Sequence, residues 1–153
     1  MTDAVPLERR ASLVTGAAAS LLLVDLFLGW QRVAMQMGGF LYVGATASGW
    51  SGWGALAGVC AIAVLVVIIA RGPTPAVAAL ALGALLFTAV AVLAGQAHVD
   101  VGAPMMRAQV HTTLWPAWAG LALAGVMAAA AAVPYLARPR ERGPASLAPH
   151  GPA

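Results

Sequence analysis

Apolar residues gather in four long stretches of this chain, and polar residues are largely confined to the segments between them. The stretches cover about residues 11–30, 53–71, 75–95 and 115–137. Each is close to the ~20 apolar residues with which a helix crosses the hydrocarbon core of a bilayer. The pattern therefore predicts an all-α membrane protein whose residues 1–137 form a four-helix transmembrane bundle. The first stretch is too long for the core of a cleaved signal peptide, so we expect it to remain as a span.

Arginines lie mainly on one side of these stretches. Arginine in short connections marks the cytoplasmic side of a membrane protein. Only Arg32 and Arg107 fall in the two outer segments. Both termini should therefore be cytoplasmic. The residues that anchor this topology are Arg9, Arg10, Arg71, Arg138, Arg140 and Arg142.

The composition excludes a protein that is soluble in water. Hydrophobic residues make up 61% of the chain and charged residues 8%, whereas about 25% of the residues in a soluble domain are charged. The net charge of +3 comes from arginine alone. Because these cations flank the spans, we expect them to attract anionic lipid headgroups and not nucleic acid. Residues 138–153, rich in proline and arginine, should form a disordered cytoplasmic tail.

The segments between the stretches carry signals for turns and strands. Thr74 before Pro75 predicts an N-cap and a proline at the first helical position, and Thr113 with Pro116 suggests the same for the last helix. Two glycines, Gly38 and Gly39, separate short apolar runs, which is typical of a β-hairpin. A small extracellular hairpin is therefore plausible, and residues 98–101 alternate as a further strand would. The alternative is irregular interfacial loop.

All five tryptophans fall near the outer ends of the stretches. Amphipathic indole rings collect at the headgroup level, so they predict an interfacial aromatic belt. A ligand-stacking cluster is the less common alternative. The belt agrees with the orientation that the arginines indicate. Its members are Trp30, Trp50, Trp53, Trp115 and Trp118.

Asp25 is the one acidic residue inside an apolar stretch. Acids within a membrane are costly and frequently functional, which suggests a proton or cation site. The alternative is a hydrogen-bonded carboxyl near the interface. No partner acid or lysine lies in another stretch, which makes a proton relay the less favoured interpretation.

Methionine and histidine gather in the outer segments. Thioethers with imidazoles suit copper, so an outer-face copper or haem site is a further hypothesis. The spacing is not diagnostic, and we expect no bound cofactor. The candidate ligands are Met35, Met37, His98, Met105, Met106 and His111.

Small residues one turn apart occur in every stretch. Gly54-x-x-x-Gly58 and Gly120-x-x-x-Ala124 are two of these pairs. Such faces let helix backbones approach closely in lipid, and we expect them to pack within the monomer. An alanine-rich composition also produces these pairs by chance.

Two short motifs carry a family resemblance. Residues 26–30, Leu-Phe-Leu-Gly-Trp, and residues 47–50, Ala-Ser-Gly-Trp, resemble those of small uncharacterised four-helix integral membrane proteins of actinobacteria. The resemblance covers the first half of the chain best, and Gly29 stands where that group often has proline. It implies a multi-pass protein of the bacterial plasma membrane and supplies no catalytic residues. The loop layout is also similar to that of claudin-like proteins, but their outer-loop cysteine pair is absent, since Cys60 is the only cysteine.

No motif for catalysis accompanies the four stretches. The chain has no lysine to complete a phosphate-binding loop, no Ser/His/Asp set and no paired carboxylates. We therefore expect an accessory or structural subunit, not an enzyme, that acts through association with a membrane-protein partner or a second copy. The alternatives are a small transporter or proton-coupled carrier that uses Asp25, and the outer-face copper or haem binder.

Overall fold

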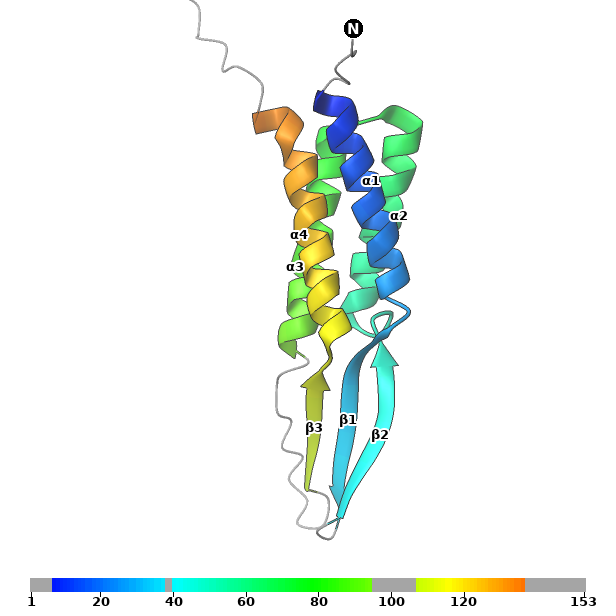
Figure 1. Cartoon of the computed structure of the whole chain (residues 1–153), viewed down its shortest axis with the longest axis vertical. Helices are drawn as coiled ribbons and strands as arrows, with labels where there is room; N and C mark the ends of the chain where they lie inside the picture. The colour runs from blue at the N-terminus through cyan, green and yellow to red at the C-terminus, as the bar shows by residue number, and fades with distance from the viewer. Residues whose placement is uncertain (1–6, 38–39, 95–106, 137–153) are drawn as a thin grey trace, which may run out of the picture.

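The computed structural model describes residues 7–37, 40–94 and 107–136, which form four helices and a small sheet. Figure 1 shows the helices side by side as an elongated bundle, with the sheet projecting from one end. The predicted strand at residues 98–101 and the predicted tail at 138–153 lie outside the described residues. The elements are α1 Leu7–Asp25, β1 Gly29–Met37, β2 Phe40–Ser48, α2 Trp53–Arg71, α3 Pro75–Ala94, β3 Arg107–Thr113 and α4 Trp115–Leu136.

Three of the described helices, α2, α3 and α4, are long and apolar enough to cross a membrane. This supports a membrane-embedded protein. The first helix, α1, is not among them, because its 19 residues include four charged ones. The fourth span therefore stays a prediction. The charged residues of α1 are Glu8, Arg9, Arg10 and Asp25.

Helices α2 and α3 meet in a tight turn at the end of the bundle opposite the sheet (Figure 1). Gly72 takes a φ of 72°, a left-handed conformation that glycine adopts without strain, and its N–H donates to the Ile68 carbonyl at 3.0 Å. Pro75 begins α3, as predicted. The predicted N-cap bond is wrong, because the Thr74 hydroxyl makes no hydrogen bond. The backbone carbonyl of Thr74 accepts from the Val77 N–H at 2.9 Å instead.

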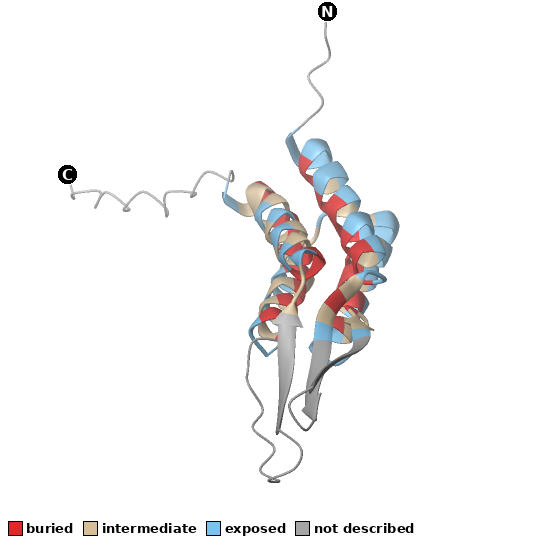
Figure 2. Cartoon of the chain, turned by 60° about the horizontal axis from the view of Figure 1, so that its bottom comes forward, coloured by how far each residue is buried: buried red, intermediate tan, exposed pale blue. Residues whose placement is uncertain are grey.

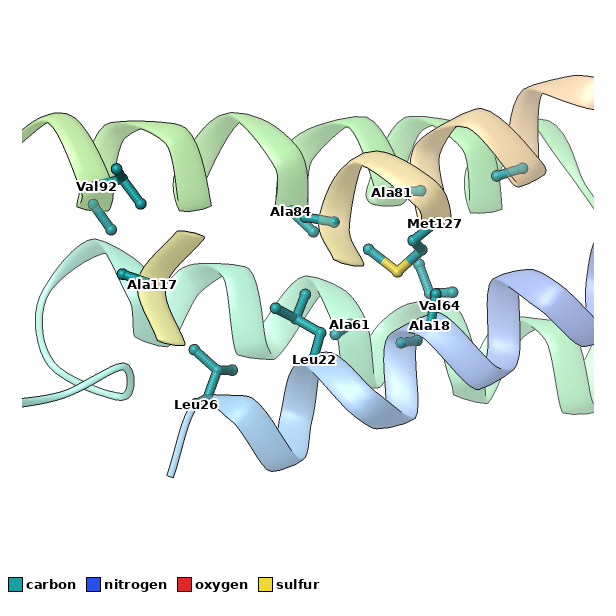
Figure 3. Close-up of a cluster of buried hydrophobic side chains, with 14 of the residues drawn as sticks. Ala18, Leu22, Leu26, Ala61, Val64, Ala81, Ala84, Val92, Ala117 and Met127 are labelled. Atoms are coloured by element: carbon teal, nitrogen blue, oxygen red, sulfur yellow. The ribbon is translucent and has the colours of Figure 1, made fainter. Parts of the chain in front are cut away.

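The bundle is closed by small side chains. Helix α1 packs against α2 and α4, and α3 packs against the same two helices. Figure 2 shows the buried residues along the inner sides of the helices, and Figure 3 shows how few of them are large. Leu22, Val64 and Met127 are fully buried among many alanines. Alanine faces let backbones approach closely, which supplies dispersion contact where lipid offers no hydrophobic driving force.

Strands β1 and β2 form the predicted hairpin. They pair antiparallel, and the Met37–Phe40 pair closes it around residues 38–39. A third strand, β3, pairs antiparallel with the other side of β1, so the sheet order is β2-β1-β3. The hydrophobic pattern did not predict a strand at Arg107–Thr113. The fold is thus mostly helical with a small sheet, and not purely helical.

Candidate functional site

The junction between α1 and the sheet is closely packed and hydrogen-bonded. The helix ends at Asp25, whose carbonyl accepts the Leu28 N–H at 2.9 Å. Strand β1 begins at Gly29, directly after Leu28. This short turn returns the chain toward the end of the helix, so that Trp30 lies beside Asp25.

The indole N–H of Trp30 donates to two oxygens of Asp25. Its indole Nε1 lies 3.1 Å from the backbone carbonyl oxygen and 3.1 Å from the carboxyl Oδ2. Trp30 is 2% exposed and Asp25 is 6% exposed. A buried carboxyl needs a donor, and this N–H supplies one without a second ionisable group. The contact therefore fastens the first residues of β1 to the end of α1.

Two glycines make room for this contact. A Cβ on Gly120 of α4 would lie 2.6 Å from Asp25 Oδ2 and 2.6 Å from Trp30 Cζ2. A Cβ on Gly49 would lie 2.6 Å from Trp30 Cε2 and 2.9 Å from the Leu26 Cα. Real Cβ atoms do not approach other atoms so closely, so a side chain at either position would force the neighbouring atoms to shift. We call Asp25, Trp30, Gly49 and Gly120 the Asp25 joint.

Further hydrogen bonds connect the base of the sheet to the bundle. The Trp30 carbonyl accepts from the Leu114 N–H at 2.8 Å, just before α4. Gln31 Nε2 donates to the Ala91 carbonyl of α3 at 3.2 Å. Together with the Asp25 joint, these bonds fix the base of β1 to α1, α3 and the start of α4.

A second tryptophan packs on a glycine beside the joint. A Cβ on Gly58 of α2 would lie 2.6 Å from the ring of Trp50. Its ring also meets Phe27 edge-on, with centroids 5.6 Å apart. Aromatic rings as well as neighbouring helices therefore pack against the glycines of the small-x-x-x-small pairs. The expectation that these faces pack within the monomer agrees with the contacts of Gly58 and Gly120.

The five tryptophans occupy different environments. Trp115 is 73% exposed, and Trp53 and Trp118 are each 49% exposed. Trp50 is partly buried. Trp30 differs from the others because it fills the interior of the joint. The interfacial belt stays a prediction for the exposed members.

Three predicted topology anchors lie at the end of the bundle opposite the sheet. Arg9 and Arg10 belong to the start of α1, and Arg71 ends α2 (Figure 1). The side of the membrane that this end faces stays a prediction. The anchors Arg138, Arg140 and Arg142 lie outside the described residues.

Part of the predicted metal-ligand set falls in the sheet. Met35 and Met37 belong to β1, and His111 belongs to β3. The register pairs Val33 with His111 and Met35 with Gln109, so the backbones of Met35 and His111 lie on adjoining strands. Within the described part of the chain, no group of three or more His, Cys, Asp or Glu residues could hold a metal ion. The candidates His98, Met105 and Met106 lie outside the described residues.

Comparison with protein families, curated proteins and solved structures gives no match to this chain. In the Asp25 joint, one carboxyl is enclosed by an indole and a glycine backbone. This arrangement favours the structural interpretation of Asp25 over a proton relay.

Proposed function

We propose that the protein is a four-span protein of the bacterial plasma membrane that holds a three-stranded sheet outside the bilayer for association with a membrane partner or a second copy. It acts as an accessory or structural subunit. The observation that carries the proposal is the Asp25 joint, which fixes the base of the sheet to the bundle.

The surface of α1 supports a fourth span. Its exposed side chains are mostly apolar, with Leu13 65%, Leu21 56% and Val24 65% exposed. The Ser20 hydroxyl donates to the Gly16 carbonyl at 3.0 Å, so this polar group is satisfied within the helix, as a lipid-facing helix requires. The buried Asp25 does not face lipid. At 1.5 Å per residue the helix is about 28 Å long, close to the hydrocarbon thickness of a bilayer.

The arginine distribution supports the orientation. Arg9, Arg10 and Arg71 lie at the bundle end opposite the sheet. Arginine in short connections stays on the cytoplasmic side. The sheet then lies on the outer side, and the N-terminus lies in the cytoplasm.

The strand order supports association through the sheet. Among the described strands β1 is central, so β2 and β3 each have one side that pairs with no other described strand. Backbone N–H and C=O groups on such an edge can pair with a strand from another chain. The proposal therefore places the partner contact on the outer sheet and not on the lipid-facing helices.

Site-specific photo-crosslinking in native membranes tests the association. A crosslinking amino acid replaces Tyr42 on β2, and a matched control replaces Leu86, which is 61% exposed on α3. We expect a protein adduct of defined mass from position 42 and lipid adducts from position 86. Protein adducts from position 86 with none from position 42 would contradict association through the sheet.

The sheet register favours a second candidate function, outer-face copper binding. It brings Met35 of β1 near His111 of β3 in the backbone pairing, and thioether with imidazole is a ligand set that suits copper. Competition with a coloured Cu(I) chelator tests it. We expect Met35→Leu and His111→Asn to weaken any competition, while the core variant Met127→Leu does not. A wild-type protein that does not compete would eliminate this function.

A further inference from the structure

The three strands of the sheet follow the long axis of the bundle (Figure 1). Strand β1 comes after α1 and runs away from the helices, whereas β2 and β3 run back toward them and lead into α2 and α4. Both pair antiparallel with β1, which lies between them. Among the described strands, the two open edges of the sheet therefore belong to strands that run in the same direction.

The edge formed by β2 is the better suited of the two to pair with another strand. Charged side chains and prolines are common protections of an exposed edge. Strand β2, Phe-Leu-Tyr-Val-Gly-Ala-Thr-Ala-Ser, contains neither, whereas β3 begins with Arg107. From Phe40 to Val43 the pairing of β2 with β1 continues without a register shift. This regular stretch, at the far end of the hairpin, offers a continuous edge to a further strand.

In the proposed membrane orientation, the strands of every copy of the chain run in the same direction. The arginine distribution gives all copies one orientation, so that β2 and β3 of each copy run toward the membrane. The described strand that runs the other way, β1, already pairs on both sides. A second copy in the same membrane therefore offers only strand edges that run parallel to β2.

Symmetry removes the simplest contact between two copies. A closed dimer within one membrane has its two-fold axis along the membrane normal, and this axis places identical residues of the two chains at the same height. The hydrogen bonds of a parallel ladder are slanted, so the two strands of the ladder are offset. Two β2 edges therefore cannot pair across this axis.

We propose that the β2 edge binds an extended segment of a different membrane protein, which runs away from the membrane and pairs antiparallel with residues 40–43. A segment that directly follows a span at the outer face has this direction, as β1 has after α1. Main-chain hydrogen bonds supply the affinity in such strand addition. Because residues 40–43 are Phe-Leu-Tyr-Val, the segment should be rich in β-branched or aromatic residues. The inference rests on the proposed function, since it specifies the partner of the same sheet.

Two membrane-anchored probes test the direction of the partner strand. Each joins a poly-leucine span to the segment 33–37 of this chain, Val-Ala-Met-Gln-Met, part of the strand that pairs antiparallel with β2. The segment follows the span in the outward probe and precedes it in the inward probe, and it lies on the outer side in both. Each probe is co-expressed at a matched level with the full chain that carries a photo-crosslinking amino acid in place of Tyr42.

The yield of crosslinked probe decides the direction. We expect an adduct of the outward probe from position 42. The inward probe should give no more adduct than a poly-leucine span without the segment. An equal or greater yield from the inward probe would overturn the proposal.

A matched position on β3 tests the choice of edge. The same crosslinking amino acid replaces Gln109, which belongs to the strand on the other side of β1. We expect no adduct of the outward probe from position 109. Equal yields from positions 42 and 109 would overturn the assignment to the β2 edge.

Two tagged copies of the chain separate this inference from the proposed function. The chain with the crosslinker at position 42 carries one epitope tag, and a second full-length copy carries another. We expect native adducts that contain the first tag alone. Adducts with both tags would overturn the inference and leave association through the sheet in place. If position 42 gives no adduct with any native membrane protein, the proposed function is contradicted and the inference falls with it.

Discussion

Replacing Trp30 by phenylalanine isolates the hydrogen bond of the Asp25 joint. The ring stays aromatic, and the N–H that lies 3.1 Å from both Asp25 oxygens is removed. The backbone carbonyl and the carboxyl of Asp25 then lose the donor that Trp30 supplied. Both lie in a site that is almost closed to solvent. The perturbation therefore tests whether this contact fastens the sheet to the bundle.

The expected loss of stability follows from the cost of an unpaired buried group. Such a group costs about 1–3 kcal/mol in water-soluble proteins. Hydrogen bonds in membrane proteins average about 0.6 kcal/mol, and the smaller phenyl ring also leaves space, which adds to the cost. We expect Trp30→Phe to lower the free energy of unfolding by about 1–3 kcal/mol. Trp118→Phe, at a residue 49% exposed, should change it by less than about 0.5 kcal/mol.

Reversible unfolding of detergent-solubilised protein with increasing sodium dodecyl sulfate, followed by circular dichroism, measures these differences. A double-mutant cycle of Trp30→Phe with Asp25→Ala should give a coupling of about 0.5–2 kcal/mol, as expected for residues in contact. Additive losses, or a Trp30→Phe loss no greater than that of Trp118→Phe, would refute the reasoning.

Two further predictions concern the same joint. Gly120→Ala should destabilise the protein by about 1–3 kcal/mol in the same assay, because its Cβ would lie 2.6 Å from Asp25 Oδ2 and Trp30 Cζ2; Gly125→Ala, on the same helix with nothing within 4 Å of the added Cβ, should be neutral or slightly stabilising. Asp25→Asn should leave proton flux in proteoliposomes equal to that of the wild type, since the amide oxygen still accepts from Trp30. A loss of flux would favour the carrier interpretation instead.

The apolar pattern predicted three helices almost to the residue. The predicted stretches 53–71, 75–95 and 115–137 correspond to α2, α3 and α4. Their apolar runs are bounded by glycine, proline and polar residues, which mark helix ends clearly.

The end of the first helix was predicted too far along the chain. Its apolar run continues to Trp30, whereas α1 ends at Asp25 and a strand begins at Gly29. A continuous apolar run does not distinguish a helix from a buried strand. Of the apolar residues after Asp25, Leu26 and Trp30 are buried in the core, whereas Phe27 and Leu28 are 74% and 43% exposed.

The Asp25 joint and β3 depend on contacts between distant residues. Gly120 lies far from Asp25 in the sequence, and its closeness to the carboxyl follows from how α4 packs on α1. Strand β3, Arg-Ala-Gln-Val-His-Thr-Thr, has weak alternation of its own and is defined by pairing with β1. The sequence singled out Asp25 as an acid in an apolar stretch, Gly120 in a small-residue pair and Trp30 in the predicted belt, but nothing in it indicated that the three meet.

The orientation of the two bundle ends is the central claim, and cysteine labelling of intact cells tests it most directly. In a Cys60→Ala background, Ser51→Cys places a thiol at an exposed position near the sheet, and Thr2→Cys places one at the N-terminus. We predict that a membrane-impermeant maleimide labels the Ser51→Cys variant in intact cells and the Thr2→Cys variant only after permeabilisation. Labelling of Thr2→Cys in intact cells, with Ser51→Cys protected, would contradict the account.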